Sequence, residues 1–239
     1  MSTSRVDRER HALLWRIHRR FPTVTATVQF GPVTFPFTRV ADPDRVLDEV
    51  AEEEDRRERL GGVRIEDPLH LPYWAELWDS AAGMAQYLAR EPTAIASKRV
   101  LDLGCGQGLA GCAAAALGAN VLFADLEPPA LLFAKLNSLP FSPRVRTRRL
   151  NWQRDRLDER FDVILGADIL YERKQWEFLE PFWRAHLSHA GSVLLGEPGR
   201  QTGDLFVEWI AQRGWWLERF EEPVPTRDRP IRIFKLRLR

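Results

Sequence analysis

The sequence has few of the features that mark membrane, secreted or metal-binding proteins. Its 239 residues include only two cysteines, Cys105 and Cys112, and their spacing fits neither a metal site nor a redox pair. No apolar run reaches the length of a membrane span, and residues 1–20 are charged throughout, so we expect neither a transmembrane helix nor a signal peptide. A reducing, cytoplasmic setting is therefore expected.

Strong net charge is also missing. The formal charge is +1, and the basic residues are nearly all arginine, since the chain has only the lysines Lys98, Lys135, Lys174 and Lys235. No overall field therefore favours a nucleic acid or a membrane surface as partner. His186 and His189 form an H-x-x-H pattern, but no carboxylate arrangement completes a zinc site, so no metal is expected. We interpret these two histidines as a surface helix end.

The length and the 44% hydrophobic content suit one full core with an N-terminal addition. Residues 1–70 predict a short amphipathic helix, a hairpin over Thr23–Phe30 and Val33–Val40, and a charged helix from Pro43 to about Leu60 that Gly61-Gly62 ends. We expect this part to be a small α/β appendage. From Lys98 onward, apolar strand patterns alternate with helical ones, which predicts an α/β fold with a doubly wound sheet in residues 71–239.

The central feature is the stretch from Val100 to Gly108. An apolar run ends at Asp102-Leu103, glycines follow at Gly104, Gly106 and Gly108, and an alanine-rich helical segment begins at Leu109. Glycines allow a sharp turn and close approach of a ligand to the backbone, and the helix N-terminus attracts anionic groups. A tight turn without a ligand is the alternative interpretation.

A second strand pattern, from Asn120 to Ala124, ends at Asp125, about 20 residues beyond the glycine loop. An acid in that place can accept hydrogen bonds from both hydroxyls of a ribose. The glycine loop and this acid together predict a cofactor that contains a nucleoside.

The extended form V-L-D-L-G-C-G-x-G resembles motif I of the seven-strand S-adenosylmethionine methyltransferases. The resemblance implies S-adenosyl-L-methionine as cofactor, S-adenosyl-L-homocysteine as product, and a Rossmann-like sheet in the order 3-2-1-4-5-7-6 with strand seven antiparallel. It also implies cofactor contacts from the loop residues Asp102, Gly104, Cys105, Gly106 and Gly108, besides Asp125.

Aromatic residues occur on both sides of the loop. Trp74 and Trp78 precede it, and we expect at least one of them to line the cofactor pocket, because aromatic faces attract the sulfonium cation. Asn151 and Trp152 follow the third strand, where an aromatic face and an amide suit a purine. For all three tryptophans, ordinary core packing is the alternative.

The fourth strand pattern ends in Ala167-Asp168 and is followed by Tyr171. In open α/β sheets these strand ends face the ligand crevice. We therefore expect Ala167 to border the cofactor, Asp168 to orient an acceptor amine and Tyr171 to shape its channel. The alternative is that Asp168 only contacts the cofactor and Tyr171 only packs.

The combination of Trp78, Asn151-Trp152 and Asp168-x-x-Tyr171 resembles methyltransferase family 16, whose members are largely protein-lysine methyltransferases. The segments 72–75 (Pro-Tyr-Trp-Ala) and 196–200 (Gly-Glu-Pro-Gly-Arg) resemble the branch of the electron-transfer flavoprotein β-subunit lysine methyltransferases. This implies a protein substrate with an acceptor lysine, with that β subunit as one candidate. The N/D-P-P-Y motif of amino-methyltransferases acting on bases is missing. A small-molecule N-methyltransferase and a non-catalytic cofactor-binding module remain as alternatives.

Overall fold

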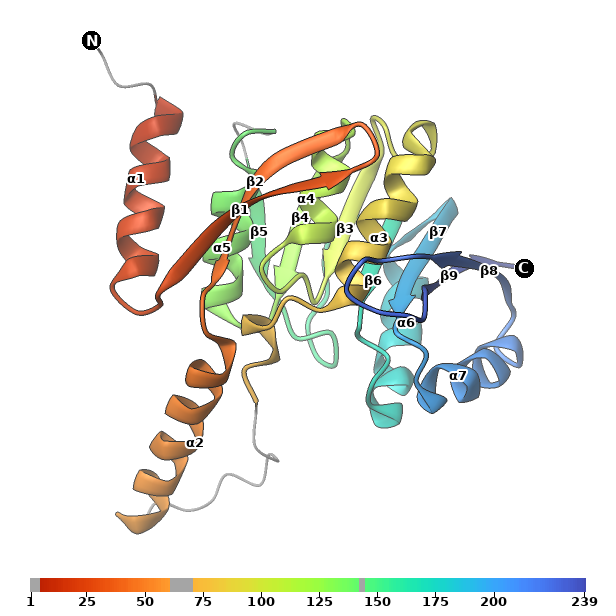
Figure 1. Cartoon of the computed structure of the whole chain (residues 1–239). Helices are drawn as coiled ribbons and strands as arrows, with labels where there is room; N and C mark the ends of the chain where they lie inside the picture. Colours follow the sequence, from red (N-terminus) through yellow and green to blue (C-terminus); the bar gives the residue numbers. More distant parts are fainter. Residues whose placement is uncertain (1–4, 61–70, 142–144) are drawn as a thin grey trace.

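The computed structural model describes residues 5–60, 71–141 and 145–239 (Figure 1). Its helices and strands follow the predicted order. They are α1 (Arg5–His18), β1 (Thr23–Phe30), β2 (Val33–Val40), α2 (Pro43–Arg59), α3 (Asp79–Arg90), β3 (Arg99–Leu103), α4 (Leu109–Ala116), β4 (Asn120–Asp125), α5 (Pro128–Ser138), β5 (Arg146–Arg149), β6 (Phe161–Ala167), α6 (Trp176–His186), β7 (Leu187–Glu197), α7 (Gln201–Ala211), β8 (Trp215–Glu222) and β9 (Ile231–Leu238). Short 3-10 helices cover Tyr73–Ala75, Pro92–Ala94 and Arg173–Gln175. The predicted glycine pair at the end of α2 lies outside the described residues.

The central sheet has seven strands in the order β5-β4-β3-β6-β7-β9-β8. Numbered along the chain from β3, this is 3-2-1-4-5-7-6, and β9 runs antiparallel to both β7 and β8. The first crossover from β3 to β4 and the later return to β6 place β4 and β6 on opposite sides of β3. The predicted fold is thus confirmed. Its order reverses beside β3, which is where open sheets of this type form their ligand crevice.

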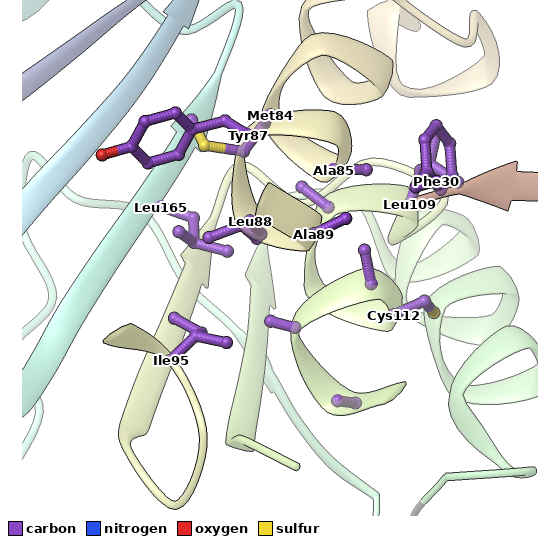
Figure 2. Packing of buried hydrophobic residues seen from close by; sticks show 14 of the residues in the cluster. Phe30, Met84, Ala85, Tyr87, Leu88, Ala89, Ile95, Leu109, Cys112 and Leu165 are labelled. Atoms are coloured by element: carbon purple, nitrogen blue, oxygen red, sulfur yellow. The ribbon is translucent and has the colours of Figure 1, made fainter. Parts of the chain in front are cut away.

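Two helical layers cover the sheet because alternate residues of each strand point to opposite faces. On one face α3 and α4 pack against Val100, Phe123 and Leu165. Figure 2 shows Ala85 and Ala89 of α3 on the side of Leu109 and Cys112 of α4. On the other face α6 and α7 pack against strand residues such as Leu101 and Ile164. Both faces are therefore buried, which explains why the central strands read as nearly continuous apolar runs.

The N-terminal hairpin is joined to the main core. Phe35 and Phe37 of β2 belong to the same buried cluster as α3 and α4. The Thr38 amide donates to Asn137 Oδ1 of α5 at 2.8 Å, and the Val40 amide donates to Gln107 Oε1 of the glycine loop at 2.8 Å. Strand β2 therefore supports the loop from behind, whereas α2 extends away from the sheet (Figure 1).

His186 ends helix α6 as expected, but the expected surface position is wrong. Its side chain is buried at 2% exposure, at the junction of α6 and β7. Nε2 accepts the Leu157 amide at 2.9 Å, so Nδ1 carries the proton and donates to the Phe182 carbonyl at 2.7 Å. The histidine closes a buried junction, whereas His189 is exposed.

Two features are missing from the described residues. None of their helices has the length and apolar character needed to cross a bilayer. Nor do three or more of their histidine, cysteine or acidic side chains gather in a way that could hold a metal ion.

Candidate active site

The glycine loop leaves β3 and enters α4 in a tight turn. Gly104 and Cys105 donate their amides to the Ala124 carbonyl at 2.9 and 3.1 Å, so the loop is fastened to β4. Gly106 has a φ of +51°, and a Cβ added there would meet only the Trp74 carbonyl, at 3.7 Å. The space beside Gly106 is therefore open enough for a ligand to approach the backbone.

Gly108 has a different role from the predicted cofactor contact. A Cβ on this residue would lie 2.8 Å from both Cα and Cβ of Ala134 on α5, and the residue is buried. Its φ of +88° also belongs to the left-handed region. Gly108 thus allows α4 to begin against α5, and it does not face a ligand.

Asp125 stands at the tip of β4, beside the loop. Its Oδ2 accepts the Gly106 amide at 2.8 Å and its Oδ1 accepts the Glu127 amide at 2.9 Å. Burial raises the pKa of this carboxyl from 3.8 to about 6, although the two backbone amides oppose the shift. Each carboxylate oxygen can accept a further bond. Asp125 is therefore fixed to the loop in a position where it can also receive two ribose hydroxyls.

Asp102 does not reach the ligand side of the loop. It is 1% exposed, and its Oδ2 accepts the Gly111 amide inside α4 at 2.9 Å. Burial raises its pKa to about 7. The predicted cofactor contact is corrected to a structural one, because Asp102 ties the end of β3 to the first turns of α4. Burial also raises the pKa of the Cys105 thiol well above its usual value, so this thiol stays protonated.

The two tryptophans before the loop, Trp74 and Trp78, have different surroundings. The Trp74 ring is 8% exposed and packs against Phe21 and Phe133, with ring centroids 5.2 and 6.0 Å away. Core packing is thus the correct interpretation for Trp74. Trp78 is half-buried, its Nε1 donates to the Tyr73 carbonyl at 3.0 Å, and its ring lies 5.9 Å from the Arg200 guanidinium.

Trp152 lies next to the loop. A Cβ added to Gly104 would approach its ring to 3.5 Å, and its Nε1 donates to Gln175 Oε1 at 3.0 Å. Asn151 forms a local turn in which its Oδ1 accepts the Gln153 amide at 2.9 Å. The ring of Trp152 therefore lies beside Gly104 at the end of β3, and Asn151 turns the chain just beyond β5.

The β6 tip holds Asp168 in a strained conformation. Its φ is +61°, which is uncommon for a residue with a side chain, and its amide donates to the Gly196 carbonyl at 2.9 Å. One carboxylate oxygen accepts the Ser80 hydroxyl at 3.2 Å, and the other forms an ion pair with Arg200. Ala167 pairs with Gly196 in the sheet just below.

Tyr171 follows the tip of β6 and packs against Tyr73. Its ring contacts that of Tyr73, with centroids 5.6 Å apart, and 43% of the residue is exposed. Burial of the hydroxyl, then Glu172 and Tyr73, and after them Asp125 and Asp168, raise the pKa of Tyr171 above 10.0. The phenol therefore stays protonated and lies within electrostatic reach of both aspartates.

A hollow of about 400 Å³ opens beside Asp168, and we refer to it as the Arg200 hollow. It is lined by Trp78, Asp79, Asp168, Pro198, Gly199, Arg200, Arg227 and Arg229. The sequence alone indicates no role for Arg200 beyond the resemblance of the segment 196–200, and no local pattern distinguishes Ser80. The Ser80 hydroxyl lies 88 positions from its partner Asp168, so only folding could reveal the contact.

Comparison with known proteins identifies relatives. A family model described as lysine methyltransferase matches residues 64–212. The electron transfer flavoprotein beta subunit lysine methyltransferase of Danio rerio is 34% identical over 139 residues, covering 56% of this chain and 52% of that protein. Protein N-lysine methyltransferase METTL21A of Xenopus tropicalis is 38% identical over 129 residues, covering 51% of this chain and 58% of that protein. The chain thus spans about half the length of the curated relatives that it matches.

The fold has solved counterparts. A TehB-like SAM-dependent methyltransferase from Corynebacterium glutamicum superimposes with a TM-score of 0.53 at 21% identity, covering 83% of this chain and 100% of the other. That likeness supports the sheet and its helical layers. The resemblance expected from the sequence is confirmed, because the family model covers more than half of the chain. This protein belongs to the lysine methyltransferase family.

Proposed function

We propose that this protein is an S-adenosylmethionine-dependent protein-lysine N-methyltransferase. The proposal rests on one observation. In this member of the lysine methyltransferase family, three candidate site residues lie at the carboxyl ends of neighbouring strands. The open Gly106 turn after β3, Asp125 after β4 and Asp168 after β6 share the carboxyl edge of one parallel sheet. Ligands bind at this edge in open α/β folds.

The cofactor half of the proposed site consists of residues that fit a nucleoside. Asp125 has free lone pairs for the ribose hydroxyls, and Gly106 leaves room for the ligand chain beside the loop. Trp152 and Asn151 border the place for the adenine, with Ala167 at the neighbouring strand tip. When bound, S-adenosylmethionine supplies a sulfonium methyl group that passes to the acceptor nitrogen as its carbon–sulfur bond breaks, leaving S-adenosylhomocysteine.

The acceptor half must receive a lysine amine and dispose of its proton. A free lysine has a pKa of about 10.4, so holding it neutral at pH 7 costs about 4.6 kcal/mol. Asp168 presents carboxylate lone pairs that can orient the N–H bonds of the amine. The rings of Tyr171, Tyr73 and Trp78 form an aromatic wall that can align the aliphatic part of the side chain. Alignment of this kind can supply up to about 7–11 kcal/mol of the catalytic effect.

A protein acceptor fits the openness of this half. Tyr73 and Tyr171 are 45% and 43% exposed, and none of the described residues among 5–60 lines the Arg200 hollow. The described side chains of residues 5–60 therefore form no lid over the hollow beside Asp168, whereas an enzyme for small molecules would be expected to have one. The β subunit of electron-transfer flavoprotein is the first substrate to test, because relatives are named for it. The two free thiols support a reducing, cytoplasmic setting as part of the proposal.

The test uses labelled S-adenosylmethionine and a protein extract from the source organism. Methyllysine mapped by mass spectrometry is the expected product, and it should disappear with Asp168→Ala. Calorimetry should show S-adenosylhomocysteine binding that this variant retains, since the lost contact is made to the acceptor. Turnover of small amines such as nicotinamide without any methyllysine would replace the proposal with a small-molecule N-methyltransferase. Cofactor binding without turnover of any acceptor would indicate a non-catalytic module.

A further inference from the structure

Both oxygens of Asp168 are held by side chains from other parts of the fold. The Ser80 hydroxyl comes from the first turn of α3 and is completely buried. The Arg200 guanidinium comes from the turn between β7 and α7, and it forms an ion pair with the second oxygen. Asp168 is therefore oriented by two donors, while each oxygen keeps a lone pair for another partner.

Arg200 is itself held by a buried ion pair. Glu197 and Arg232 are 1% and 7% exposed and bind each other. Glu197 accepts the backbone amides of Gly199 and Arg200, and Arg232 donates to the Arg200 carbonyl at 2.8 Å. The turn that carries Arg200 is thus fixed from the core. A surface ion pair without such support would contribute little.

Two further facts support an acceptor position beside the Asp168–Arg200 pair. Arg200 and Asp168 both line the hollow of about 400 Å³, and Arg200 lies over the ring of Trp78. The backbone of Asp168 is strained at a φ of +61°. Strain of this kind persists only where the surrounding contacts determine it.

We propose that Arg200 and Ser80 are positioning residues that hold the Asp168 carboxylate for the acceptor amine, and that Arg200 also offsets its charge. This inference rests on the proposed function. An unpaired buried carboxylate would bind a lysine ammonium and stabilise its unreactive charged form. Paired with Arg200, the same carboxylate can still accept an N–H bond, yet it favours the ammonium less. Within residues 5–60, 71–141 and 145–239, the other charged or titratable groups facing this pair are Asp79, Tyr171, Glu197, Arg227, Arg229 and Arg232.

The experiment compares Arg200→Ala, Arg200→Lys and Ser80→Ala with the wild type. The rate of methyllysine formation is measured in the protein extract with labelled S-adenosylmethionine, with and without millimolar guanidinium chloride. Arg184→Ala is the matched control. Arg184 lies on α6, away from the site. It also pairs with a buried acid, Glu180, and its guanidinium lies 5.4 Å from the ring of Trp215.

Arg200→Ala should reduce the rate about 10- to 100-fold, as expected when a reacting group is misplaced, with unchanged S-adenosylhomocysteine affinity. Guanidinium should restore part of the rate in this variant and not in wild type or Arg184→Ala. Ser80→Ala should show a smaller loss that guanidinium does not restore. Arg200→Lys keeps the charge and should retain more activity than Arg200→Ala. It therefore tests the inference even if Arg200→Ala folds poorly.

Three outcomes would overturn the inference. An unchanged rate in Arg200→Ala would show that Asp168 needs no such support. An equal loss of cofactor affinity, or a loss that neither guanidinium nor Arg200→Lys restores, would show that Arg200 only stabilises the fold. These outcomes require an active wild type. Absence of methyllysine with the wild type would instead overturn the proposed function itself, and this inference with it.

Discussion

The cofactor affinity of this protein should depend on pH through Asp125. Burial holds the pKa of this carboxyl at about 6, compared with 3.8 in the free residue. Below pH 6 the free protein therefore takes up a proton, and the carboxylate that would accept two ribose hydroxyls is lost. From about pH 7 upward the group is charged and affinity should be constant. The expected effect is about tenfold weaker binding of S-adenosylhomocysteine at pH 5 than at pH 7.

The matched variant is Asp125→Asn, which keeps an acceptor for one of the two amides, from Gly106 and Glu127, that bind the carboxylate. Loss of a charged hydrogen-bonding partner should weaken binding by about 1.5–3 kcal/mol at pH 7, or about 10- to 150-fold. The dependence on pH should also become shallower. Asp102 titrates near pH 7 and remains in the variant, so the comparison is between the two slopes.

Isothermal titration calorimetry between pH 5 and 8 measures both quantities, and circular dichroism at each pH confirms that the protein is folded. A wild-type affinity that does not change between pH 5 and 7, or an identical slope in Asp125→Asn, would refute the assignment of the ribose hydroxyls to Asp125.

Three further predictions concern stability and acceptor use. Asp102→Asn keeps an acceptor for its amide partner and removes a carboxyl whose pKa is raised from 3.8 to about 7 in the folded protein. Its gain in the free energy of unfolding over wild type should therefore be larger at pH 8 than at pH 5 in chemical denaturation, growing by about 1.4 kcal/mol per pH unit up to pH 7. Gly108→Ala should destabilise the fold by about 1–3 kcal/mol in chemical denaturation, because its Cβ would meet Ala134, and more than Gly118→Ala, whose Cβ would meet no atom within 4 Å although its φ is also left-handed. In methylation assays Tyr171→Phe should lose less activity than Tyr171→Ala if the ring lines the channel; equal losses would assign the role to the hydroxyl.

Much of the fold was predictable because the decisive signals are local. The strands β3, β4 and β6 are short apolar runs bounded by glycine or an acid, and both faces of a parallel strand need apolar residues. The glycine loop and Asp125 were predictable for the same reason, since a tight strand–helix turn requires specific residues at fixed spacing. The strand order came from the resemblance to a family, because alternation along the chain does not state which strands are neighbours.

Other features were decided by the tertiary structure. An apolar pattern indicates that Trp74 is buried, but it does not indicate whether the ring lines the ligand site or packs in the core. In the folded protein the ring packs against Phe133. Likewise, a strand-end acid such as Asp168 is recognisable in the sequence, yet its partners Ser80 and Arg200 lie 88 and 32 positions away. The sequence by itself determined which residues form the sheet and its loop. Only the packing of distant segments decided which buried groups meet, because contacts between elements depend on geometry that no local spacing contains.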